Sequence, residues 1–151
     1  MFLNVRGVTG EAVDPEHTGE IEVVSWSWGM QAPGEPMAGR ASGKTTFGEL
    51  IVVKGVDQST PTLMSFLRSN KLVADATLTV RKAGKTPLDY LKIELQNVRV
   101  ASLKVESEGV ALRERLSLGF SRVRVAYTPQ ADSGAKGGGD NVFEADTQAG
   151  T

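Results

Sequence analysis

Apolar and polar residues alternate along most of this chain, which is the pattern of strands with one buried face. The clearest example is the segment 75–82, where Ala76, Leu78 and Val80 share one face. Further strands are predicted at 2–6, 20–28, 49–54, 89–98, 98–107 and 112–127, separated by polar segments rich in Gly, Pro and Asp. The pattern predicts an all-β protein.

One stretch, Thr60–Lys71, instead has apolar residues at helical spacing, with Leu63, Phe66 and Leu67 at i, i+3 and i+4. Thr60 is expected to cap the first amide groups, with Pro61 at the first helical position. A single short helix cannot bury its apolar face alone, so it must cover or plug a sheet. The predicted fold is all-β with one short α-helix, as a compact barrel or sandwich of two curled antiparallel sheets.

The strand at 20–28 has an irregular pattern. Ile21 and Val23 share one face, whereas Val24, Trp26 and Trp28 share the other. Either a β-bulge shifts the phase near Val23 and Val24, or both faces of this strand are covered. The apolar run 50–53 also implies cover on both sides, which is more typical of an oligomer than of a small monomeric barrel.

Two other phase changes are expected to be bulges or bends. One lies near Ala101 and Ser102, and the other lies near Ser121 and Arg122 within a long strand. Repeated bulges let long strands curl into a barrel.

Two segments lack strand or helix periodicity. The segment 29–45 contains four glycines and two prolines, and a connection of this length tends to be functional. After residue 130 the composition changes to Gly, Asp and Ser. We therefore expect one barrel domain over 1–130 and a flexible Gly-rich tail over 131–151.

Composition narrows the function classes. The 151 residues suit one domain, and the net charge of −1 with scattered basic residues gives no footprint for nucleic acid or an anionic membrane. There is no cysteine, which excludes disulfides and thiolate metal sites. The N-terminus does not resemble a cleavable signal peptide, and no segment suits membrane insertion. A protein made in the cytoplasm is expected, and export by a dedicated machine is compatible with this.

Catalytic and cofactor motifs are weak. The segment Gly39–Thr45 resembles a phosphate-binding loop, but the first glycine would have to stand at 38, where the chain has Ala38, and a strand rather than a helix follows. The single histidine, His17, is expected to be a solvated loop residue. No cofactor is predicted, and a small soluble ligand-binding or hydrolytic β-barrel enzyme is the alternative function.

Several motifs occur together in a familiar order. Glu20–Val23 followed by Ser25-Trp-Ser-Trp-Gly29 resembles the signature strand of the haemolysin-coregulated protein (Hcp) family, the tube proteins of type VI secretion systems. Other segments that resemble this family are Lys54 with 57–64, Leu78–Gly84, 90–95, Arg115–Phe120 and Tyr127–Gln130. The resemblance covers residues 1–130.

The resemblance implies a hexameric ring that stacks into a tube, is exported by a contracting sheath together with a spike, and carries small effector proteins in its lumen. It further implies a cytoplasmic protein that is secreted without a cleaved signal peptide, and a structural protein rather than an enzyme.

The site residues expected on this basis fall into three groups. The large aromatics Trp26 and Trp28 are expected in the core or a ring interface, because such residues usually pack. Ser25 and Ser27 then lie on the opposite face, toward either the outside of the ring or its lumen, and the lumen is our prediction. The loop is expected to make ring-to-ring contacts through Gln31, Glu35, Met37, Arg40 and Lys44.

Overall fold

A computed structural model describes residues 1–33, 44–82, 87–131 and 136–147. Strands dominate these residues, with one helix. The elements are β1 (Phe2–Val5), β2 (Ile21–Ser27), β3 (Met30–Gln31), β4 (Thr46–Phe47), β5 (Leu50–Gly55), α1 (Ser59–Ser69), β6 (Val73–Lys82), β7 (Leu88–Glu108), β8 (Ala111–Gly119), β9 (Arg122–Tyr127) and β10 (Asn141–Asp146). The predicted all-β class with one short helix is confirmed.

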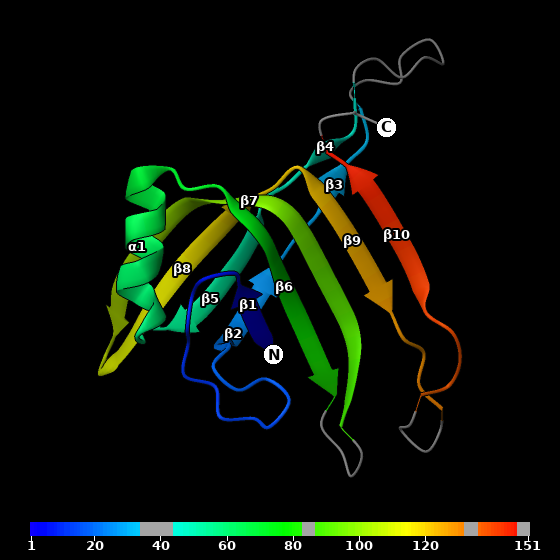
Figure 1. Ribbon diagram of the computed structural model, residues 1–151, viewed down its shortest axis with the longest axis horizontal. Helices are drawn as coiled ribbons and strands as arrows, with labels where there is room; N and C mark the ends of the chain where they lie inside the picture. The colour runs from blue at the N-terminus through cyan, green and yellow to red at the C-terminus, as the bar shows by residue number, and fades with distance from the viewer. Residues whose placement is uncertain (34–43, 83–86, 132–135, 148–151) are drawn as a thin grey trace.

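The main sheet closes on itself. Its strand order is β10-β9-β7-β6-β1-β2-β5-β8, and β7 also pairs with β8, so the six strands from β7 to β8 form a closed antiparallel barrel (Figure 1). Closure depends on the length of β7. Its first half pairs with β6 up to Val98, and its second half pairs with β8 from Arg99 onward. Closing the barrel leaves no free edge between these strands.

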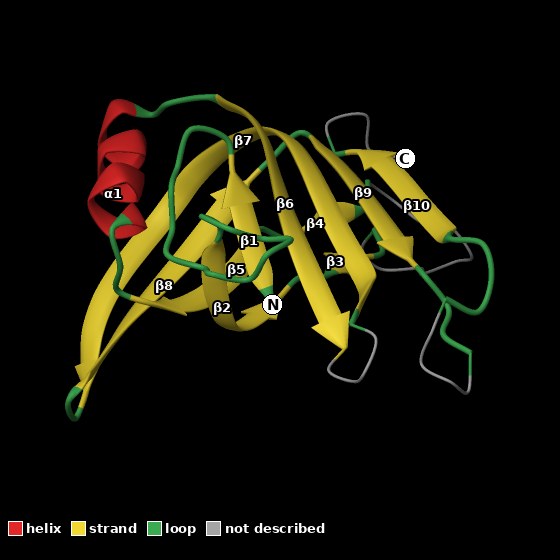
Figure 2. Ribbon diagram, turned by 60° about the horizontal axis from the view of Figure 1, so that its bottom comes forward, coloured by secondary structure: helices red, strands yellow, loops and turns green. Residues whose placement is uncertain are grey.

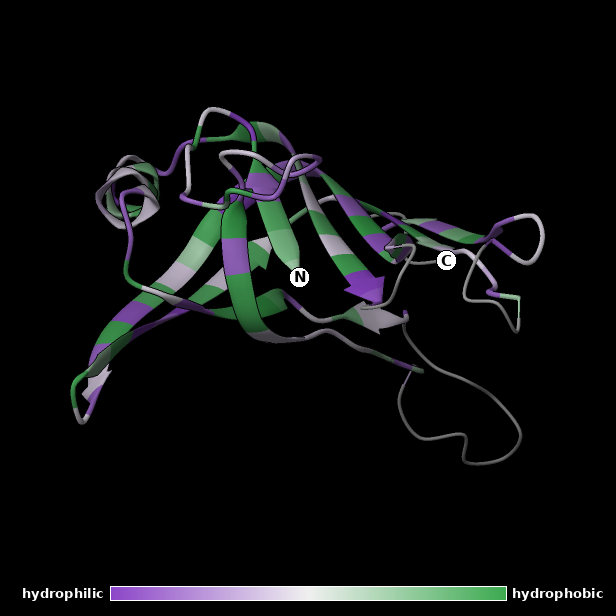
Figure 3. Cartoon of the chain, turned by 90° about the horizontal axis from the view of Figure 1, so that it is seen from below, coloured by the Kyte–Doolittle hydropathy of each residue, from purple (hydrophilic) through white to green (hydrophobic). Residues whose placement is uncertain are grey.

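Aliphatic side chains from alternate positions of the strands form the core of the barrel. Figure 3 shows the matching alternation of hydrophobic and hydrophilic residues as colour bands along the strands. The most deeply buried include Leu3, Leu50, Leu78, Leu116 and Leu118, each with no exposed surface. Each such side chain contributes roughly 1.5–3 kcal/mol through removal from water. The strand predictions therefore hold where alternation was regular.

Helix α1 packs beside β7, at the left of Figure 1. It begins earlier than predicted: Gln58 is the N-cap residue, Thr60 lies inside the helix, and its side chain is buried. The expected cap at Thr60 is wrong because Asp57 takes that part, its carboxylate accepting the amide N–H of Ser59 at 2.9 Å. The helix ends at Asn70, which adopts a left-handed φ of 53°.

The irregular pattern of the strand at 20–28 has a local cause. The register of β2 against β5 shifts between Val23 and Ser25, so the bulge is confirmed and Val24 is 50% exposed. The second predicted irregularity is also present, as a register shift between Val100 and Ser102 in β7. Of the two explanations for this strand, the bulge is therefore the one that the structure supports.

Two sequence predictions are wrong in detail. The long strand expected at 112–127 is two strands, because β8 pairs with β5 and β7 whereas β9 pairs with β7 and β10. The expected flexible tail contains β10, which pairs with β9 over all six of its residues. β10 is short and its apolar residues do not alternate regularly, so it does not stand out in the sequence. The free edge of β9 supplies the hydrogen bonds that order β10.

Candidate functional site

The outer face of β2, β5, β8 and the second half of β7 collects the predicted lumen residues. Two rows of paired residues cross this surface, which we call the serine face: Ser27, Ile51, Ser117 and Ser102 form one, and Ser25, Val53, Arg115 and Lys104 form the other. Residues paired across antiparallel strands share one face of the sheet, so these eight side chains lie on the same side.

Exposure agrees with that placement. Ser25 and Ser27 are exposed, Ile51 and Val53 are half-buried, and Ser117 is buried. Helix α1, at the left of Figure 2, contacts the opposite side, because its Thr60 donates to the buried Glu114 of β8. Trp26 pairs with Val52 on the opposite face, where Val52 is fully buried. The serines and the tryptophans thus lie on opposite faces of β2.

Both tryptophans are half-buried and pack against the core. The indole N–H of Trp28 donates to the carbonyl oxygen of Gly48 at 2.9 Å, and its ring lies 6.4 Å from the ring of Phe120. Trp28 therefore ties the end of β2 to the turn before β5.

Beyond Trp28 the chain forms a short arm, in which Met30 pairs with Phe47 and Gln31 with Thr46. Gln31 and Lys44 are exposed, while Glu35, Met37 and Arg40 lie outside the described residues, as does most of the phosphate-loop-like segment. The arm borders a surface hollow that also includes Ser27 and Ile51. The arm and the serine face are therefore contiguous.

The core face of the sheet continues outside the barrel over β9 and β10, at the right of Figure 1. Leu78, Ile93, Val125 and Phe143 lie in one cross-strand row, and exposure rises along it from fully buried at Leu78 to 40% at Phe143. Tyr127, on the same face, is 44% exposed. We call Val125, Tyr127 and Phe143 the apolar extension.

The other face of these strands is charged. Arg124 donates to Glu94 at 2.8 Å and to Glu144 at 3.1 Å, and the hydrogen bond that Glu94 accepts is the main cause of the raised pKa of Arg124. This ladder joins β7, β9 and β10, although partly exposed ion pairs add little stability each.

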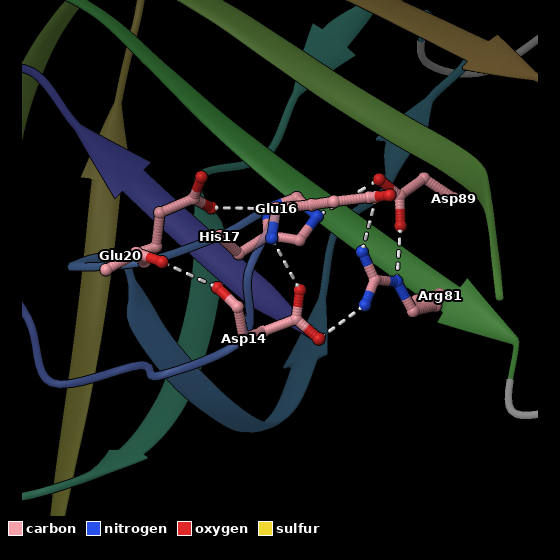
Figure 4. A network of polar contacts seen from close by, with 7 residues as sticks. Asp14, Glu16, His17, Glu20, Arg81 and Asp89 are labelled. Carbon is pink, nitrogen blue, oxygen red and sulfur yellow. Dashed lines mark hydrogen bonds and ion pairs between the residues drawn. The ribbon is translucent and has the colours of Figure 1, made fainter.

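His17 is not the solvated loop residue that the sequence predicted. It is buried, its ring stacks on Phe2 at 4.4 Å, and its two ring nitrogens each lie 3.0 Å from a carboxylate oxygen, of Glu20 and of Asp89 (Figure 4). Glu20 is only three residues away, but the ring of Phe2 and the carboxylate of Asp89 are distant in sequence, so the local sequence did not reveal the burial of His17.

Arg81 completes this network. Its guanidinium binds Asp89 at 2.9 Å, Asp14 at 2.5 Å and Glu16 at 2.9 Å (Figure 4). The bond to Asp89 is the main cause of its raised pKa. The network fastens the connection between β1 and β2 onto β6 and β7.

The same network lowers two carboxyl pKa values. The backbone N–H of Glu16 and then Arg81 lower the pKa of Asp14. Burial raises the pKa of Asp89, but bonds from Arg81 and His17 outweigh it, and the net pKa is lowered.

One metal-binding geometry occurs among the described residues. Ligand atoms of Glu16, His17 and Asp89 lie within 4.8 Å of one another. Arg81 already binds both carboxylates, so a metal ion would have to compete with this fixed cation. The chemistry of the cluster is thus that of a structural ion-pair network.

A second charged group lies inside the barrel. The Nζ atom of Lys54 binds Glu114 at 2.8 Å and Thr60 at 3.1 Å, and lies 3.2 Å from Asp57. A signal for this cluster was present in the sequence, because Glu114 shares the even-numbered phase of Leu116 and Leu118, which face the core. The cluster fixes the start of α1 against β5 and β8.

Comparison with known proteins identifies the family. The family model described as "Type VI secretion system effector, Hcp" matches residues 2–127. The chain belongs to the Hcp family of type VI secretion systems. It is 40% identical to protein hcp1 of Pseudomonas aeruginosa over 144 residues, which covers 92% of this chain and 89% of that one.

Solved Hcp structures share the fold. Hcp1 from Salmonella typhimurium is 31% identical, with a TM-score of 0.79 over 99% of this chain and 95% of that chain. A type six secretion system protein reaches a TM-score of 0.90 at 20% identity, over 99% of this chain and 96% of that chain, which supports the fold alone. The resemblance inferred from the sequence motifs is confirmed.

In this Hcp chain, the structure brings Ser25, Ser27 and the base of the loop together on one side of the barrel. The Hcp match ends at Tyr127, so β10 lies beyond it. Within the described ranges, no helix has the length and apolar character needed to cross a membrane.

Proposed function

We propose that this protein is a structural subunit of the type VI secretion inner tube and not an enzyme. Six copies form a ring, and rings stack into a tube that sheath contraction expels behind a spike. Small effector proteins travel in the lumen. The protein is made in the cytoplasm and leaves the cell without a cleaved signal peptide. Membership of the Hcp family and the uncovered apolar extension support this proposal.

The apolar extension carries the ring proposal. The apolar extension continues the core face of the sheet, but Phe143 is 40% exposed and Tyr127 is 44% exposed. Exposure of a contiguous apolar surface to water is unfavourable, and such surfaces mark interaction sites. The apolar extension lies at one side of the barrel, so we propose that it contacts a different surface of the next copy. Such a heterologous contact generates a closed ring when the rotation between neighbouring copies closes.

We further propose that the serine face lines the lumen of the ring. The small hydroxyls of Ser25 and Ser27 leave a wettable, low-profile wall, which suits a channel. The adjacent arm, bordering Ser27, then lies at a rim of the ring and contacts the next ring in the stack. Gln31 and Lys44 supply polar groups at the base of the arm, and Glu35, Met37 and Arg40 are assigned to the same contact from the sequence.

Ring formation is tested by light scattering after size exclusion at micromolar concentration. The expected mass is six times that of the chain. Phe143→Glu is expected to give monomers, because a carboxylate would be buried without a partner. Val110→Glu is the matched control, since Val110 is fully exposed at the β7–β8 turn. A monomeric wild-type protein would refute the ring.

The lumen is tested with Ser27→Cys, which introduces a lone thiol into a chain without cysteine. In the assembled ring, a small maleimide should label it faster than one that carries a long polymer. Equal labelling rates would place Ser27 outside the channel, and no labelling by either reagent would place it in an interface.

A further inference from the structure

The serine face carries two cations side by side, and only one of them has an ion-pair partner among the residues that the structure describes. Arg115 and Lys104 are directly paired across β8 and β7, and both are exposed. Like charges at directly opposed positions destabilise a sheet. Among the residues that the structure describes, Lys104 forms one ion pair, with Glu106 at 3.6 Å, and both side chains are largely exposed. Arg115 has no ion-pair partner among these residues. An arrangement that costs stability in the free protein points to a bound anion.

We propose that the serine face binds acidic segments of polypeptides, with Arg115 as the main anchor. This inference rests on the proposed tube function, in which the face lines the lumen, and it specifies which cargo the lumen favours. A guanidinium binds a carboxylate through two parallel hydrogen bonds, which gives geometric selection beyond charge alone.

The neighbours of Arg115 suit a polypeptide. Val53, its cross-strand neighbour on β5, is half-buried and offers aliphatic contact. Ser25, next in the same row, is exposed and offers a hydroxyl that can donate to or accept from a peptide group. Charge, apolar contact and hydrogen bonding thus occur along one row.

The same face is poorly suited to nucleic acid. Proteins that bind single strands combine basic grooves with aromatic side chains on which bases stack. Neither row of the serine face contains an aromatic residue, and both tryptophans of β2 lie on the opposite face. We therefore assign the face to acidic polypeptide.

A ring would repeat the face around its channel. Each exposed Arg115 contributes a modest, salt-sensitive interaction, and repeated sites linked in one ring raise the overall affinity of a cargo that reaches several of them. Retention that is weak per site would also let cargo leave the tube.

The test uses the full chain and a short fluorescein-labelled peptide of alternating Glu and Ser. Fluorescence anisotropy should show binding that weakens as salt rises. Arg115→Gln should weaken binding about tenfold, the value expected when one charge-assisted contact of about 1.4 kcal/mol is lost. Arg115→Lys should retain part of the affinity. Lys92→Gln, the same change of charge at an exposed position on β7 outside this face, should leave it unchanged.

Ring mass is measured on each sample, which separates the two proposals. Wild-type protein that forms no ring would refute the tube function. An intact ring that ignores the acidic peptide, or that loses equal affinity with Lys92→Gln, overturns the cargo inference alone. Equal or tighter binding of a single-stranded oligonucleotide of the same charge also overturns it, because the face would then select any polyanion.

Discussion

The Nζ atom of Lys54 lies 2.8 Å from Oε1 of Glu114, and neither side chain is exposed to solvent. Thr60 donates to the same carboxylate oxygen at 2.6 Å. Removal of one member of a buried ion pair leaves the other charge uncompensated, which costs about 3–5 kcal/mol. We expect Lys54→Met to lower the free energy of unfolding by this amount, measured by urea denaturation at one fixed protein concentration.

The double variant Lys54→Met with Glu114→Leu should recover much of that loss, because two apolar side chains can replace a buried pair. Lys92→Met is the control, since Lys92 is exposed, and it should change stability little. If Lys54→Met and Lys92→Met lowered the free energy of unfolding equally, the buried pair would not be important for stability.

Acid should destabilise the connection between β1 and β2. The pKa values of Asp14 and Asp89 are lowered in the folded protein, so their contribution is fully present above the unfolded carboxyl pKa of about 3.9. It is lost as pH falls from there through the lower folded values. Hydrogen exchange of residues 10–20 should therefore accelerate below about pH 4.

Arg81→Gln removes the cation common to both carboxylates and should reduce this acid dependence. Arg68→Gln, an exposed cation on α1, is the control and should retain the wild-type profile. An unchanged acid profile in Arg81→Gln would show that the network does not couple the segment to pH.

Gly10 is required for close approach of two backbone segments. A Cβ atom at this position would lie 2.4 Å from the carbonyl oxygen of Glu20, which is too close for any real contact. We expect Gly10→Ala to cost about 1–3 kcal/mol, as overpacking does, measured by thermal unfolding. Gly55→Ala is the matched control, because a Cβ there meets no atom within 4 Å, and its effect should stay within about 0.5 kcal/mol.

Ser27→Gln tests the serine face without disturbing the core. Ser27 is exposed on the face opposite Trp26, so a longer side chain should leave the ring mass unchanged and alter which small proteins co-purify with it. Ser65→Gln, on the exposed side of α1, should alter neither. Loss of the ring in Ser27→Gln would place this residue in a subunit interface instead.

Local pattern was enough for much of the fold. Periodicity is a property of neighbouring residues, so most strands followed from alternation and the single helix followed from the i, i+3, i+4 spacing of its apolar residues. The bulges near Val24 and Ala101 followed for the same reason, because a bulge shifts the phase of the apolar positions. The family followed from several short motifs between Glu20 and Gln130, and the family model matches residues 2–127.

Contacts with residues distant in sequence decided where α1 starts and that residues 141–146 form a strand. Thr60 looked like a cap, but Lys54 and Glu114 draw its hydroxyl into the core, and Asp57 caps instead. β10 is short, and its apolar residues Val142, Phe143 and Ala145 do not alternate regularly; it is ordered by pairing with the open edge of β9.

The sequence by itself determined the strand-rich class with one short helix, the family and the alternation that puts Ser27 opposite Trp26. Only the tertiary structure decided barrel closure through β7, the burial of His17 between Glu20 and Asp89, and the cation pair of Arg115 and Lys104. These features join residues that are far apart in the chain or paired by strand register. Their energies depend on distance and solvent access in the folded protein, which no local pattern of residues records.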